Sequence, residues 1–277
     1  MTVLVFTLLL LGGAYLAGLV GSLTGLGGGV IIIPLLSLAF NVDIRYAIGA
    51  ALLTSIANSS GAASAYVKEG ITNIRLGMFL EIATTTGAIA GALIAIYTPV
   101  NAIAILFGLV LIFSAFATLR KNNEAALKEG SAGAARLKLN GSYPTKEGAV
   151  PYYLKNVPAG FFIMTLAGIF SGLLGIGSGA LKVLAMDSAM RVPFKVSTTT
   201  SNFMIGVTAT ASAIVYLQRG YMDAGIAFPV VMGVLAGAFT GSRLLSRINA
   251  RTLKIIFSAA IVLVALEMMY NGFNHKF

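Results

Sequence analysis

Apolar runs of about 20 residues recur from one end of this 277-residue chain to the other. A helix that crosses a bilayer needs about this length, because it rises about 1.5 Å per residue through about 30 Å of hydrocarbon. The candidate spans fall at about 3–22, 46–66, 75–96, 100–119, 157–173, 195–217, 224–244 and 252–270. Two further apolar pieces, at about 30–40 and 179–189, are long enough to cross only about half of the bilayer. The sequence therefore predicts an all-α polytopic membrane protein.

The composition excludes most other classes of protein. Hydrophobic residues make up 57% of the chain and charged residues only 10%, whereas a soluble domain carries about 25% charged residues. The chain has no cysteine, and its single histidine, His275, lies close to the C-terminus. Thiolate catalysis, a histidine triad and a multi-histidine metal site are therefore excluded. We expect a protein that is not an enzyme and has neither a bound metal nor another cofactor.

Each short apolar piece follows a break that is dense in glycine. The first break contains Gly25, Gly27, Gly28 and Gly29, and the second contains Gly175, Gly177, Ser178 and Gly179. A helix that begins inside the membrane presents free N–H groups and the positive end of its dipole, which attract anions. Glycine also lets a ligand approach the backbone closely. We interpret the breaks as binding loops for an anion; the alternative is that the glycines only allow tight helix packing.

The two halves of the chain match each other when the sequence is shifted by 150 residues without a gap, and we call this constant shift the repeat offset. It places Gly175 on Gly25, Tyr216 on Tyr66 and Gly220 on Gly70. A constant register over such a distance indicates an internal duplication. We expect a first membrane repeat at 1–119, a basic linker at 120–156 and a second membrane repeat at 157–277. Each repeat would contain a glycine-broken, re-entrant-like hairpin and three spanning helices.

The distribution of basic residues predicts the orientation. If the linker is cytoplasmic, 15 of the 19 lysines and arginines lie on the same side of the membrane, as the positive-inside rule requires. The net charge of +10 is then explained by topology, without a nucleic-acid partner. Equivalent loops of the two halves fall on opposite sides, which makes the repeats inverted. We expect a multi-pass protein of the inner (plasma) membrane, and paired broken segments in inverted repeats point to a transporter's midplane site.

The stretch from Gly25 to Pro34, together with the second glycine break at the repeat offset, resembles the TauE/SafE family of sulfite and sulfonate transporters. The Tyr-x-x-x-Gly pattern at 66–70 and 216–220 fits the same family, and the resemblance covers about residues 12–270 except the linker. It implies a homodimeric permease for small sulfur-containing anions such as sulfite or sulfoacetate. The halves differ chemically, because Ser178 stands where the first half has Gly28, and Leu184 replaces Pro34.

Two charged residues inside predicted membrane segments are candidates for function. Lys182 lies about one turn into the second short piece, and its counterpart in the first half is Ile32. A charge at this depth costs at least ~2.5 kcal/mol, so an anionic substrate or a carboxylate should lie beside it. Glu81 could pair with Lys182 or carry a coupled proton. The alternatives are a static ion pair or snorkelling for Lys182, and for Glu81 an interfacial position beside Arg75.

Polar side chains also lie on the second span of each half. Asn58 belongs to a polar stripe with Thr54, Ser55 and Ser59, and Thr200 and Asn202 begin the matching helix. Hydroxyl and amide donors can bind an oxyanion without a full charge. The alternative is that they form hydrogen bonds between helices, each worth less than ~1 kcal/mol.

The favoured function is secondary transport of small sulfur anions by alternating access around half-helix N-termini at the midplane. No ATP-binding motif is present, so the energy would come from the gradient of a proton or another coupling ion, from the membrane potential, or from the substrate's own gradient. An anion channel on the same scaffold is the first alternative. An intramembrane enzyme, which would need Lys182 with Ser178 or Thr200 as a nucleophile–base pair, is the second.

Overall fold

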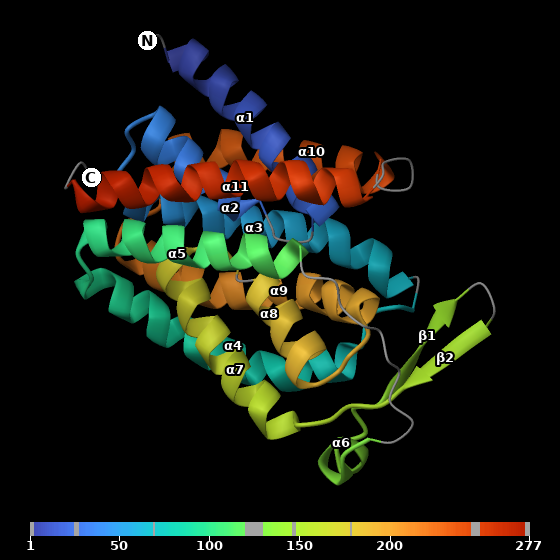
Figure 1. Ribbon diagram of the computed structural model, residues 1–277. Coiled ribbons are helices and arrows are strands. Elements are labelled where there is room, and N and C mark those ends of the chain that lie inside the picture. Colours follow the sequence, from blue (N-terminus) through green and yellow to red (C-terminus); the bar gives the residue numbers. More distant parts are fainter. Residues whose placement is uncertain are drawn as a thin grey trace.

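The computed structural model describes residues 3–24, 28–68, 70–119, 130–145, 148–177, 179–244 and 250–274. Figure 1 shows a bundle of long helices, with a small hairpin projecting from one end. The elements are α1 (Val3–Thr24), α2 (Gly29–Pro34), η1 (Leu35–Ala39), α3 (Ile44–Lys68), α4 (Ile74–Tyr97), α5 (Val100–Leu119), α6 (Ala132–Arg136), β1 (Gly141–Thr145), β2 (Gly148–Tyr152), α7 (Val157–Leu174), α8 (Gly179–Leu184), η2 (Ala185–Ala189), α9 (Phe194–Gln218), α10 (Ala224–Leu244) and α11 (Ala250–Phe273).

The helices have the length and composition of membrane spans. Within the described ranges, five are long and apolar enough to cross a bilayer: Leu4–Ser22, Ile74–Tyr97, Val157–Leu174, Phe194–Gln218 and Ala224–Gly241. Helices α3, α5 and α11 have 25, 20 and 24 residues, which is also long enough to cross at about 1.5 Å per residue. Large apolar side chains such as Leu8, Phe116 and Leu263 are exposed on the bundle, as contact with lipid requires. The prediction of an all-α polytopic membrane protein is confirmed.

The repeat offset reappears in the element bounds. Helices α2 and α8, the π-helical turns η1 and η2, α3 and α9, and α4 and α10 each begin at positions that it makes equivalent. Their packing is reciprocal, because α1 packs on α10 of the other half and α7 packs on α4. Helices α3 and α9 also pack on each other. The inverted orientation of the two halves stays a prediction.

Glycines allow the close contact in both reciprocal helix pairs. A Cβ at Gly87 of α4 would collide with the carbonyl oxygen of Thr165 on α7, and a Cβ at Gly237 of α10 would collide with that of Tyr15 on α1. Gly87 and Gly237 are themselves equivalent at the repeat offset. Small residues bring membrane helices close enough for backbone contact, so these pairs form the rigid frame around the centre of the molecule.

The linker contains more structure than its composition indicated. Our sequence interpretation treated 120–156 only as a basic linker, but the described part forms α6 and the antiparallel hairpin of β1 and β2, with Gly141 opposite Tyr152. Leu139, Tyr152 and Leu154 are buried in a small apolar core with residues of α4, α7 and α9. The linker is therefore anchored on the helical bundle.

Candidate functional site

The glycine breaks of the two halves meet at one side chain, Ser55 of α3. A Cβ built on Gly29 would lie 3.0 Å from the carbonyl oxygen of Gly175 and 3.2 Å from Ser55 Oγ. A Cβ built on Gly177 would lie 3.6 Å from the same Ser55 Oγ and 2.9 Å from Ile205 Cγ2 on α9. Ser55 and Ile205 are equivalent at the repeat offset. The centre of the molecule is therefore built from both breaks and from both central helices.

The backbone of the second break requires glycine. Gly175 and Gly177 have φ angles of +68° and +65°, in the left-handed region that other residues rarely adopt. The N–H of Gly175 donates to the carbonyl of Ser171 at 2.8 Å and ends α7 there. Helix α8 begins at Gly179, so glycine occupies both left-handed positions of the described part of this break.

The other predicted break residues have individual positions. The carbonyl of Gly28 accepts the N–H groups of Ile31 and Ile32, each at 3.2 Å. The carbonyl of Gly179 accepts the hydroxyl of Ser201 at 3.1 Å, which ties the start of α8 to α9. Gly25, Gly27 and Ser178 lie outside the described residues.

A chain of hydrogen bonds connects the two charged candidates. Lys182 is 0% exposed, and its Nζ donates to Thr208 Oγ1 at 2.5 Å. The Thr208 hydroxyl in turn donates to Glu81 Oε1 at 2.6 Å. Glu81 is only 7% exposed, so its carboxylate is buried instead of reaching water beside Arg75. We call Lys182, Thr208 and Glu81 the charged relay.

Thr208 was missed by the sequence interpretation, which considered only the first turns of α9. A signal was available, because Thr208 is the counterpart of Asn58 at the repeat offset. The duplication therefore pairs a predicted binding residue of α3 with the residue that joins Lys182 to Glu81.

Three of the buried polar atoms that have no hydrogen-bond partner within the described protein belong to candidate residues of α3 and α4. They are Ser55 Oγ, Asn58 Oδ1 and Glu81 Oε2. Most buried polar groups in proteins are hydrogen-bonded, so each exception indicates a possible binding role. Ser55 can donate or accept, and the side-chain amide of Asn58 also carries two donors. These groups are available to a polar ligand.

Other predicted residues hold the helices together. Ser59 Oγ donates to the backbone carbonyl of Asn202 and accepts the N–H of Gly206 at 3.0 Å, which fastens α3 to α9. Thr200 Oγ1 accepts the backbone N–H of Asn73 at 3.1 Å. The hydroxyl of Thr200 therefore faces the loop before α4, while the side chain of Asn202 is buried.

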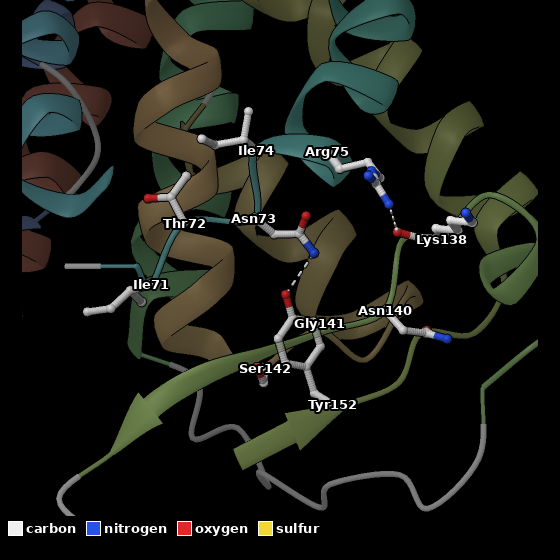
Figure 2. A pocket seen from close by; sticks show the side chains of 10 residues that line it. All are labelled: Ile71, Thr72, Asn73, Ile74, Arg75, Lys138, Asn140, Gly141, Ser142 and Tyr152. Carbon is white, nitrogen blue, oxygen red and sulfur yellow. Dashed lines mark hydrogen bonds between the residues drawn. The ribbon is translucent and has the colours of Figure 1, made fainter. Parts of the chain in front are cut away.

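A polar pocket of about 330 Å³ lies between this loop and the linker, as Figure 2 shows. It is lined by Ile71, Thr72, Asn73, Ile74, Arg75, Lys138, Asn140, Gly141, Ser142 and Tyr152. Asn73 Nδ2 donates to the hydroxyl of Tyr152 at 2.7 Å and to the carbonyl of Leu139 at 2.9 Å. Burial raises the pKa of Tyr152 above its ordinary value of 10.0, and the bond from Asn73 lowers it by less. Tyr152 is therefore neutral at physiological pH.

Asn73 thus connects the linker to the membrane site. Its side-chain oxygen accepts the N–H of Leu76 at 2.9 Å and caps α4, the helix that carries Glu81. Its backbone N–H binds Thr200 at the start of α9. The sequence offered no sign of this connection, because it depends on where the hairpin lies.

Comparison with known proteins identifies the family. The model of the family described as Sulfite exporter TauE/SafE matches residues 10–268. The chain belongs to the TauE/SafE family. This confirms the resemblance predicted from the glycine breaks and the duplication. No solved structure matches the chain.

Relatives of this TauE/SafE protein are named as membrane transporters and not as enzymes. The probable membrane transporter protein YunE of Bacillus subtilis is 27% identical over 264 residues, which cover 93% of this chain and 95% of YunE. The probable membrane transporter protein YdhB of the same organism is 24% identical, with 90% and 93% covered. The probable membrane transporter protein MJ0441 of Methanocaldococcus jannaschii is 23% identical, with 92% of each covered. This TauE/SafE protein is a multi-pass membrane transporter.

Proposed function

We propose that this TauE/SafE transporter carries small sulfur-containing anions, such as sulfite, sulfoacetate or related sulfonates, and that Lys182 contacts the anion. The observation that carries the proposal is a fully buried ammonium group in the half-helix that follows the second glycine break. A buried charge must be neutralised by a partner. Through Thr208, Glu81 does so when no substrate is bound, and an arriving anion competes for the same ammonium.

Uncharged groups complete the proposed site. Sulfite and sulfonate groups present several oxygen acceptors on a compact head, and such acceptors suit hydroxyl, amide and backbone N–H donors. Ser55 lies against both glycine breaks and has a buried hydroxyl with no partner in the described protein. We assign Ser55, Asn58, Asn202 and the glycines of both breaks to substrate binding. Thr200 is also assigned to substrate binding, because its buried hydroxyl accepts the N–H of Asn73 and can still donate its own proton.

We propose alternating access around this centre. The site draws on both halves, so a tilt of one reciprocal helix pair, α1 with α10, against the other, α4 with α7, would expose it first on one side of the membrane and then on the other. The basic linker would lie in the cytoplasm and the protein in the inner (plasma) membrane, with its halves inverted. We further propose that the protein is a homodimer, as the family resemblance implies.

A ligand panel on the purified protein tests the substrate class. The melting temperature is measured with sulfite, sulfoacetate, taurine and thiosulfate, and with chloride, acetate and phosphate as controls. A ligand at 100 times its Kd stabilises the folded state by about 2.7 kcal/mol, so at least one sulfur anion should raise the melting temperature by several degrees. The rise should persist in Lys195→Ala, which removes an exposed lysine, and should be much smaller in Lys182→Ala at the same ligand concentration. Equal shifts with chloride and every sulfur anion would contradict the proposal.

A further inference from the structure

We propose that Glu81 binds a proton whenever an anion binds at Lys182, so that each anion crosses the membrane together with one proton. The inference rests on the proposed function and specifies how the same site is energised. It is carried by the charged relay, in which one threonine hydroxyl stands between a buried ammonium and a buried carboxylate.

The charges of the relay cancel when no substrate is bound. The ammonium of Lys182 and the carboxylate of Glu81 lie no more than two hydrogen-bond lengths apart, and both side chains are buried. A monovalent anion at Lys182 would leave the site with one net negative charge in a medium of low dielectric constant. A nearby negative charge and burial both favour the protonated form of a carboxylic acid. Proton binding at Glu81 restores neutrality.

The structure provides a place for this proton. Glu81 Oε1 already accepts the hydroxyls of Thr208 and, at 3.1 Å, Thr85. Glu81 Oε2 is buried and has no hydrogen-bond partner in the described protein. A proton from water binds Oε2 as the anion enters and returns to water on the other side as the anion leaves. On binding, one O–H bond of a hydronium ion breaks and the carboxyl O–H bond forms, and on release the carboxyl O–H bond breaks and a hydronium ion forms again.

Thr208 can follow the change of charge. Its hydroxyl lies 2.6 Å from Glu81 Oε1 and 3.0 Å from the carbonyl oxygen of Met204, and one proton can serve only one of them at a time. When Glu81 is ionised, the hydroxyl donates to the carboxylate, because a charged acceptor makes the stronger hydrogen bond. When Glu81 is neutral, the hydroxyl can turn to Met204.

The other described titratable groups on the helices around Glu81 lie at or near helix ends. Helix α4 packs on α7 and α9, and the described residues of α7 include no titratable side chain. The remaining titratable residues on α4, α9 and the turn after α8 lie at or near helix ends: Arg75, Tyr97, Asp187, Lys195 and Tyr216. The proton balance at the centre of the membrane therefore depends on Glu81 and Lys182.

Transport in proteoliposomes tests the proposal with methanesulfonate, a monovalent sulfonate that takes up no proton near neutral pH, and with sulfoacetate. One-for-one exchange at equal pH on both sides reports the proposed function alone. Net uptake under an inward proton gradient reports coupling. We expect the gradient to raise wild-type net uptake at least tenfold and a protonophore to abolish the increase. For methanesulfonate, clamping the membrane potential at different values should leave the rate unchanged.

Variants locate the coupling. In Glu81→Gln, net uptake should no longer respond to the proton gradient, and in Thr208→Val the response should fall severalfold. Thr210→Val is the matched control, because this exposed threonine on the same helix donates only to its own helix backbone, and its response should equal that of the wild type. Wild-type exchange without any response to the proton gradient would overturn proton coupling and leave the proposed function intact, and an undiminished response in Glu81→Gln would overturn the role of Glu81. Absence of exchange with every sulfur anion would overturn both proposals.

Discussion

Truncation of Lys182 to alanine should weaken the binding of sulfur anions by about 10- to 150-fold. The estimate follows from the burial of the ammonium, which is 0% exposed and therefore poorly screened by water. A hydrogen bond to a charged partner contributes about 1.5–3 kcal/mol, and each 1.4 kcal/mol changes a dissociation constant by about tenfold. Lys182→Arg should keep part of the affinity, because it keeps the positive charge.

The same substitution also tests a purely structural role for the relay. Removing one member of a buried ion pair typically costs about 3–5 kcal/mol, because the other charge is left without a partner. Lys182→Ala should therefore lower the melting temperature, and adding Glu81→Gln should recover much of the loss. The two interpretations differ in affinity: a static pair predicts lower stability with unchanged binding, and a substrate site predicts weaker binding even in the stabilised double variant.

The assay is calorimetric titration of sulfoacetate, sulfite and taurine into the wild type, both single variants and the double variant, analysed as a double-mutant cycle. Lys195→Ala serves as the control for loss of an exposed lysine. An affinity that is unchanged within error in Lys182→Ala for every anion that binds the wild type would refute the assignment of Lys182 to the substrate.

Three further predictions concern the second glycine break, the contact between the linker and Asn73, and the orientation of the two halves. Gly177→Ala should destabilise the fold by about 1–2 kcal/mol, because its φ of +65° is costly for any residue with a Cβ; an unchanged melting temperature would contradict this. Tyr152→Phe should cost about 0.5–1.5 kcal/mol by removing the acceptor of the Asn73 amide, measured by denaturation against the wild type. Reporters fused near Gly70 and Gly220 should read cytoplasmic and periplasmic, respectively, and the same reading for both would refute the inverted repeats.

The helices and the duplication could be predicted from the sequence because both need only the order of residues. Hydropathy over about 20 residues determines where a membrane helix can form, and the repeat offset emerges from pairwise comparison of the two halves. The break at Gly175 and Gly177 was visible for the same reason, since a left-handed backbone strongly favours glycine. The burial of Lys182 followed from its position in an apolar run.

The contacts between distant helices could not be predicted in this way. The sequence indicated that Lys182 needs a partner and suggested Glu81, but the hydroxyl between them comes from Thr208, 26 residues after Lys182. Thr200 was expected to bind the anion because its hydroxyl lies at the start of the matching polar helix, yet that hydroxyl accepts the N–H of Asn73, which caps another helix. Such pairings depend on how α4, α8 and α9 pack, which is a property of the folded chain.

The most direct test of the account is the concentration dependence of sulfur-anion flux in proteoliposomes that contain the purified wild-type protein or Lys182→Ala. A transporter that alternates access around one site predicts flux that saturates with anion concentration, one-for-one exchange with anion trapped inside, and loss of both in Lys182→Ala. Flux that rises linearly without exchange would indicate a channel. Saturable exchange that is undiminished in Lys182→Ala would contradict the claim that the buried lysine receives the substrate.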